Sequence, residues 1–181
     1  MNLNSLKYPI GKFSKPTEIK AKDIDHWISE IEKFPSRLNQ TVNQLNEEEL
    51  SYNYRPQGGW NIRQVVHHCA DSHMNGFIRF KLALSEDSPT IKPYLEAKWS
   101  LLEDVSSAPI ADSLKILEGL HHRWVILLRS LSENDLKRTF IHPEHGKRFN
   151  LKEYIGNYAW HSNHHLAHIE QALKYKGKFE L

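Results

Sequence analysis

The sequence predicts an all-α fold, a four-helix bundle with a long connection between its second and third helices. Apolar residues recur at three- and four-residue steps in four long segments, which is the period of an amphipathic helix. Prolines gather between the second and third of these segments, so a long crossover is expected there. At 181 residues the chain fits one domain, residues 1–181, and can bury a core without disulfides.

The first helix is expected over residues 22–46. Its helix-period residues are Ile24, Trp27, Ile28, Ile31, Leu38, Val42 and Leu45. Pro35 interrupts this pattern. Because proline lacks an N–H and its ring clashes with the preceding helical turn, a kink or a break is predicted near Phe34.

The second helix is expected to begin after Asn61 and to run to about Leu84. Asn61 is a good N-cap residue, and Gln64 at the third helical position completes a capping box. The proline-containing interval 85–109 that follows favours extended or turn backbone. We expect a long crossover there, with a short helix around residues 96–102.

The third and fourth helices are expected over residues 110–131 and 151–176. The third carries an apolar stripe of Leu114, Leu117, Leu120, Trp124, Leu127, Leu128 and Leu131. Asn150 and Glu153 repeat the capping signature before the fourth helix, and Gly177 supplies its C-terminal stop. Between these helices, residues 139–142 and 147–149 flank a turn and could pair as a small hairpin.

Composition narrows the classes of partner. The chain has 24 basic and 22 acidic side chains, a formal charge of +2, and its Lys and Arg residues are scattered. No basic cluster marks a site for nucleic acid or an anionic membrane, so a small-molecule partner is expected. Cys69 is the only cysteine, which excludes an internal disulfide. With no signal-peptide pattern over residues 1–16 and no run of membrane-spanning length, a cytoplasmic protein is expected.

Five of the twelve histidines gather at two points of the sequence, His67-His68 and residues 161–165. On a helix, His161 and His165 lie one turn apart on the same face, so both imidazoles can reach one cation. A third ligand from another helix would complete a three-histidine set and leave a coordination position open. Hydrogen-bonded, partly buried histidines without a metal are the alternative interpretation.

Only one of His67 and His68 can point into such a site, because consecutive helical side chains diverge by about 100°. The His68 side of its helix carries a polar strip that suits a pocket wall or, alternatively, helix-helix hydrogen bonds: Gln64, Ser72, Asn75 and Arg79. His67 is assigned either to the surface or to a position where it contacts the metal ligands without binding the metal. The remaining histidines assigned to surface or loop are His121, His122, His142 and His145. Tyr158 shares the His161 stripe and could donate a proton or simply pack.

The chain resembles the YfiT group of the DinB-like superfamily, four-helix-bundle proteins classed as metal-dependent hydrolases. The resemblance runs almost end to end. Its motifs include Lys7-Tyr8-Pro9-Ile10-Gly11, Gly58-Gly59-Trp60, Arg63-Gln64-Val65-Val66-His67-His68, Ala70-Asp71-Ser72-His73-Met74-Asn75, Pro89-Thr90-Ile91-Lys92-Pro93-Tyr94 and Trp160-His161 through His165-Leu166-Ala167-His168-Ile169. In this superfamily one ligand follows a helix-opening tryptophan by eight residues, and two more form an H-x-x-x-H pair. The resemblance therefore implies His68, His161 and His165 as metal ligands, a homodimer and a cytoplasmic location.

Two chemistries remain open at such a site. Zinc and nickel both suit three imidazoles, and the ion could activate water for hydrolysis. Relatives of this group instead transfer low-molecular-weight thiols, such as bacillithiol, to electrophiles, so thiol S-transfer is the alternative. Ser162 follows His161, so the sequence lacks the glutamate of an H-E-x-x-H zinc protease. Candidates for acid-base help are Tyr158, Asp71, Arg79 and Glu170. A third hypothesis is a non-catalytic metal-binding or ligand-binding module.

Overall fold

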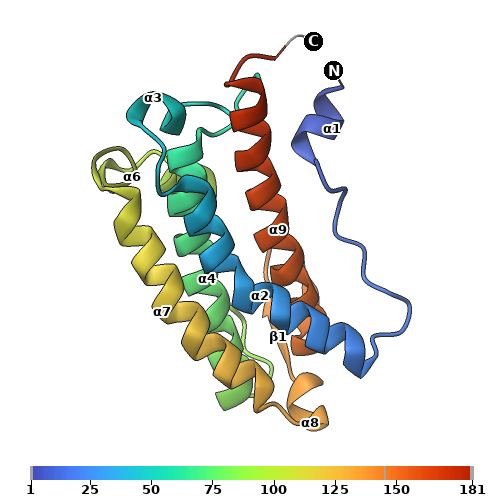
Figure 1. The fold of residues 1–181 in the computed structure, drawn as a ribbon. Coiled ribbons are helices and arrows are strands. Elements are labelled where there is room, and N and C mark those ends of the chain that lie inside the picture. The colour runs from blue at the N-terminus through green and yellow to red at the C-terminus, as the bar shows by residue number, and fades with distance from the viewer. Residues whose placement is uncertain (1, 145, 180–181) are drawn as a thin grey trace.

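The computed structural model describes residues 2–144 and 146–179, and it contains the predicted bundle (Figure 1). The four long helices are α2 (Ala21–Val42), α4 (Ile62–Ser85), α7 (Ile110–Arg129) and α9 (Leu151–Tyr175). Each lies where the apolar periodicity places it. The all-α four-helix-bundle prediction is therefore confirmed.

The long helices do not pack in the order of the sequence. Helix α2 packs against α7 and α9, and α4 packs against the same two helices. Helices α2 and α4 therefore occupy opposite corners of the bundle, and so do α7 and α9. As a result, side chains from all four helices meet along the bundle axis.

Short elements fill the connections. They are α1 (Leu3–Lys7), α3 (Glu47–Leu50), α5 (Glu96–Trp99), α6 (Glu103–Ser107), α8 (Glu133–Leu136), β1 (Thr139–His142) and β2 (Lys147–Asn150). Strands β1 and β2 pair antiparallel, with Thr139 opposite Asn150, which confirms the predicted hairpin. Helix α5 matches the short helix expected around residues 96–102. His145, in the turn between the strands, lies outside the described residues.

The N-terminal segment lies along α9 before the chain enters α2 (Figure 1). The indole N–H of Trp160 donates to the Gly11 carbonyl at 3.1 Å, and Lys15 forms an ion pair with Glu153. Asn150 caps α9 as predicted, accepting from the Glu153 N–H at 2.8 Å. The Glu153 carboxylate, however, lies against Lys15. Electrostatic contact with the N-terminal segment therefore takes the place of the expected capping box.

Helix α2 continues through Pro35 and bends along its length (Figure 1), so a kink is formed and not a break. In an α-helix the carbonyl of residue i accepts from the N–H of residue i+4. Pro35 has no N–H, and the carbonyl of Ile31 therefore loses its helical donor. That carbonyl faces the bundle interior, where it becomes an acceptor for another helix.

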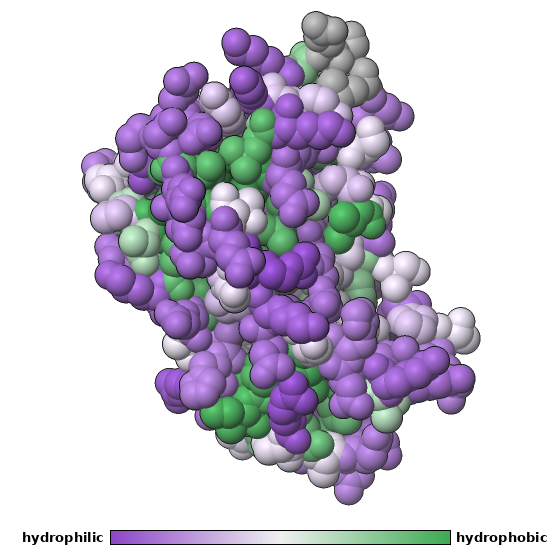
Figure 2. Space-filling model, in the orientation of Figure 1, coloured by the Kyte–Doolittle hydropathy of each residue, from purple (hydrophilic) through white to green (hydrophobic). Residues whose placement is uncertain are grey.

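The core consists of two apolar clusters stacked along the bundle axis. One lies toward the hairpin and includes Trp124 and Phe80, and the other lies toward α3 and includes Phe34 and Val65. Cys69 packs in the second cluster, and burial raises the pKa of its thiol. On the face drawn in Figure 2, hydrophilic residues predominate, with hydrophobic patches between them. Among the described residues, none of the helices has the length and hydrophobicity needed to cross a bilayer.

Candidate metal centre

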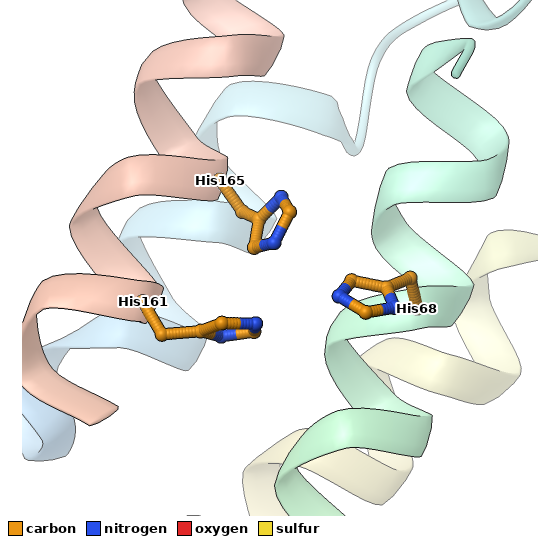
Figure 3. A group of neighbouring side chains, drawn as sticks. All are labelled: His68, His161 and His165. Atoms are coloured by element: carbon orange, nitrogen blue, oxygen red, sulfur yellow. The ribbon is translucent and has the colours of Figure 1, made fainter. Parts of the chain in front are cut away.

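The structure brings His68, His161 and His165 together. Helix α4 supplies His68, and α9 supplies the other two from successive turns, all with their rings turned toward a common point (Figure 3). One nitrogen from each ring lies within 4.8 Å of the others. The ring centroids are 4.4 Å apart for His161 and His165, and 4.8 Å apart for His68 and His165.

Burial keeps these three imidazoles neutral. It lowers the pKa of His68 to about 4 and the pKa values of His161 and His165 well below 6.5, and the neighbouring histidines lower the last two further. Among the described residues, the side chains that contribute to these three pKa shifts are other histidines, and none is a carboxylate. Three neutral nitrogens at this spacing suit a divalent ion of the zinc type, which binds imidazole nitrogen at about 2.0–2.1 Å. The residues present therefore fit the metal that the sequence led us to expect.

One polar side chain, Ser72, lies beside the histidine group, and a second, Tyr94, contacts Ser72. The hydroxyl of Ser72 lies 3.4 Å from Nε2 of His161, and it interacts with the hydroxyl of Tyr94. Tyr94 belongs to the long connection between α4 and α7, and burial raises its pKa. The sequence placed Tyr94 in a motif of the family resemblance but gave it no role, because a loop carries no periodicity that reveals which way its side chains point.

Two of the suggested acid-base residues, Tyr158 and Arg79, have other partners. The hydroxyl of Tyr158 donates to the backbone carbonyl of Ser72 at 2.8 Å, and burial raises its pKa well above 10. The guanidinium of Arg79 donates to the hydroxyl of Tyr154 at 2.8 Å. The carboxyl of Asp71 is half-buried, and burial together with Asp104 raises its pKa to about 6. Catalytic roles for Tyr158, Asp71 and Arg79 stay predictions.

His121 is buried, so its assignment to surface or loop is wrong, and burial also excludes the surface alternative for His67. His67 points away from the site as expected, but its Nδ1 lies 2.8 Å from the hydroxyl of Ser113 on α7. His121 is only 2% exposed and lies between α2 and α4, whereas His122 is exposed as predicted. His121 follows Leu117 by one turn of the buried stripe of α7, a spacing that could have revealed it.

A separate surface hollow of about 870 Å³ lies between α2 and α7. Its lining includes Pro35, Leu114, Glu118, His121 and Arg129. The three-histidine group belongs to α4 and α9, so this hollow is not the candidate metal centre. His121 lines the hollow on one side and contacts the buried His73 on the other.

The fold and the histidine group together define a helical-bundle protein with a candidate metal centre built between two of its helices. The chain belongs to the DinB superfamily, whose family model matches residues 30–169.

Similar proteins span nearly the whole chain. A Bacillus cereus protein named "Putative metal-dependent hydrolase" is 52% identical over 172 residues, covering 95% of this chain and 98% of the relative. A Halalkalibacterium halodurans protein with the same designation is 49% identical and covers 92% of this chain and 96% of the relative. The solved structure of Bacillus subtilis YfiT, described as "a probable metal-dependent hydrolase with an unusual four-helix bundle topology", matches with a TM-score of 0.92. It is 44% identical and covers 97% of this chain and 99% of YfiT.

Proposed function

We propose that this protein is a metal-dependent hydrolase in which His68, His161 and His165 hold one divalent ion, with zinc or nickel as the metal. The observation that carries the proposal is the group of three neutral imidazole nitrogens within 4.8 Å of one another. The designations of relatives that match this chain nearly end to end support it. Three protein ligands, and not four, are typical of catalytic zinc sites, because a position stays open for water or substrate.

The charge of the site favours an anionic partner for the ion. Three neutral ligands leave a divalent ion most of its positive charge, and in the described part of the chain no carboxylate is a cause of the three imidazole pKa shifts. When bound, such an ion supplies Lewis acidity and lowers the pKa of a coordinated water or thiol. The hydroxyl of Ser72, beside His161, and the hydroxyl of Tyr94, which contacts Ser72, can donate hydrogen bonds that orient a substrate or the attacking group.

Thiol S-transfer at the same centre is a second candidate function. The observation that favours it is the surroundings of Tyr158, whose hydroxyl already donates to a backbone carbonyl and whose pKa is raised by burial. This tyrosine is therefore a poor general base for hydrolysis. A thiol that has ionised needs no further base, and the negative charge of its thiolate would partly neutralise the positive charge of the ion.

Metal content of untagged protein tests the proposal first. We expect about one divalent ion per chain in the wild type, lost in His161→Ala and retained in His122→Ala, a matched change at an exposed histidine of α7. A wild type that is free of metal and also refuses added zinc and nickel would contradict the enzyme proposal and leave a helical binding module.

A substrate screen then separates the two chemistries. Esters, amides and small electrophiles would be assayed with the metal-loaded protein in the presence and absence of a low-molecular-weight thiol. Turnover without thiol supports hydrolysis, and turnover only with thiol supports S-transfer. Loss of either activity in His161→Ala, with activity kept in His122→Ala, would assign it to the candidate centre.

We further propose a cytoplasmic homodimer that acts on a small-molecule substrate, with no nucleic-acid or membrane partner. The resemblance to the YfiT group supports the dimer. The balance of 24 basic and 22 acidic side chains supports a small-molecule partner. Light scattering coupled to size-exclusion chromatography measures the oligomeric state, and a mass of one chain at micromolar concentration would contradict the dimer.

A further inference from the structure

A buried chain of imidazoles connects His161 to the backbone of α2. Nδ1 of His161 lies 3.0 Å from Nε2 of His73, and Nδ1 of His73 lies 2.7 Å from Nε2 of His121. Nδ1 of His121 in turn lies 2.7 Å from the carbonyl oxygen of Ile31. We call these four groups the core relay. They come from α9, α4, α7 and α2 in that order, so the relay crosses the whole bundle between its two apolar clusters.

The carbonyl end of the core relay sets the position of every proton in it. A carbonyl can only accept, so Nδ1 of His121 carries a hydrogen and donates to Ile31. Burial lowers the pKa of His121 to about 4, and the neutral ring therefore has a lone pair on Nε2. His73 must then donate from Nδ1 and accept at Nε2, which requires His161 to donate from Nδ1. The remaining nitrogen of His161, Nε2, then carries a lone pair and no hydrogen, and the Ser72 hydroxyl lies 3.4 Å from it.

Pro35 is the reason that the Ile31 carbonyl can anchor this relay. An ordinary residue at position 35 would donate its N–H to that carbonyl and complete the helix. Proline removes the donor, and His121 takes its place at 2.7 Å. His73 is fully buried and His121 is 2% exposed, so water does not compete for these hydrogen bonds.

A second, shorter series of histidine hydrogen bonds ends at a backbone carbonyl of α1. Nε2 of His168 lies 3.1 Å from the carbonyl oxygen of Lys7, the last residue of α1, whose carbonyl has no helical donor. Nδ1 of His168 lies 3.4 Å from Nδ1 of His165. Because the carbonyl accepts from Nε2 of His168, its Nδ1 accepts from His165 and leaves Nε2 of His165 free. We call the Lys7 carbonyl, His168 and His165 the edge relay.

We propose that His73, His121 and His168 are positioning residues, which through the two relays hold His161 and His165 in the Nδ1–H tautomer and present Nε2 of each to the metal. This inference rests on the proposed function only for the identity of the bound ion. A hydrogen bond to the second ring nitrogen of a ligand histidine fixes its orientation and raises its basicity. The unusual element here is that backbone carbonyls, freed by a proline and by a helix end, determine the tautomers.

Nitrogen-15 NMR of the metal-free wild type tests the tautomers directly. Multiple-bond proton-nitrogen spectra distinguish an Nδ1–H imidazole from an Nε2–H imidazole, and we expect the Nδ1–H pattern for both His161 and His165. An Nε2–H pattern at His161 would overturn the proposal. This measurement needs neither metal binding nor activity. The tautomer proposal can therefore be wrong while the proposed function is right, and the proposed function can be wrong while the tautomer proposal is right.

Metal affinity of relay variants gives the second test. His73→Phe keeps an aromatic ring of similar size but breaks the core relay, and we expect zinc to bind about 10–100-fold more weakly, as when outer partners of metal ligands are removed. His73→Gln retains one donor and one acceptor and should recover part of this loss. The matched control is His122→Phe, the same substitution at an exposed histidine. Circular dichroism confirms that each variant is folded.

The outcomes separate positioning from simple packing. Wild-type zinc affinity in a folded His73→Phe protein would overturn the proposal. So would equal losses in His73→Phe and His73→Gln, because packing alone does not distinguish a hydrogen-bonding side chain from an aromatic one. If His73→Phe does not fold, the tautomer of His161 in the wild type and the affinity of His73→Gln still decide.

Discussion

The core relay and the edge relay use the same chemistry at different depths of the molecule. The core relay has contacts of 2.7, 2.7 and 3.0 Å and draws on all four long helices. The edge relay has one nitrogen-nitrogen contact of 3.4 Å and depends on α1, which lies beside one end of α9 (Figure 1). The core relay therefore needs the whole bundle to be assembled, whereas the edge relay needs only the docking of the N-terminal segment.

This difference suggests that the three candidate ligands are constrained to different degrees. Hydrogen bonds of the core relay connect His161 to the centre of the fold, and those of the edge relay connect His165 to the N-terminal segment at its periphery. His68 is held by ring packing, with the ring of Trp60 at a centroid distance of 4.7 Å. Local changes at the N-terminus should therefore disturb His165 before they disturb His161.

Acidification should break both relays, and it is the largest effect that we expect. Burial lowers the pKa of His121 to about 4 and that of His168 to about 3, against 6.5 for an exposed histidine. Between these values the unfolded chain binds more protons than the folded protein, so the free energy of unfolding falls as the pH decreases. Each such histidine contributes up to about 1.4 kcal/mol per pH unit.

Urea denaturation of the metal-free protein from about pH 8 to about pH 5 measures this effect. The free energy of unfolding should be nearly constant at the upper end and fall steeply below about pH 6.5. His121→Leu should have a shallower decline than the wild type, because one depressed imidazole is removed. A flat profile down to pH 5 would contradict the buried, neutral state of these histidines.

Removing one imidazole from each relay tests the difference in depth. His121→Leu leaves the Ile31 carbonyl and the Nδ1–H of His73 buried without partners, at about 1–3 kcal/mol each. His168→Leu leaves the Lys7 carbonyl at the edge of the molecule, where water can replace the lost donor, and removes an acceptor that lay 3.4 Å from Nδ1 of His165, so a smaller loss of about 1–2 kcal/mol is expected. Urea denaturation at about pH 8, where histidine is neutral in both states, gives the two values. Equal losses would remove the distinction between the relays.

The fold followed closely from local pattern. The predicted fourth helix, residues 151–176, and the observed Leu151–Tyr175 differ by one residue, because a cap and a left-handed stop at Gly177 mark its ends. Helices α1, α3, α6 and α8 were not predicted. Each has only four or five residues, too few for an apolar period to be recognised. The diagonal placement of α2 and α4 depends on packing between distant segments, which no local signal describes.

The candidate centre was predictable only where its spacing is local. The interval between His161 and His165 is one helical turn, and the family resemblance added His68. His73 and His121 stand alone on separate helices, and their role depends on the packing of α4 against α7. The helical period predicts that such residues face the core, but it does not predict which buried residues of two helices meet.

Substituting Pro35 gives the smallest and most selective change. In Pro35→Ala the new N–H can donate to the Ile31 carbonyl and compete with His121, while the helix loses a residue that is costly in its interior. We therefore expect the free energy of unfolding to be unchanged or higher, and zinc to bind more weakly by less than about tenfold. Ser36→Ala, at an exposed neighbouring position of α2, is the control. A Pro35→Ala protein that is more stable yet binds zinc less tightly would show that the hydrogen bond from His121 to the Ile31 carbonyl supports metal binding and not overall stability. Unchanged zinc affinity would mean that His121 does not depend on this carbonyl for its orientation.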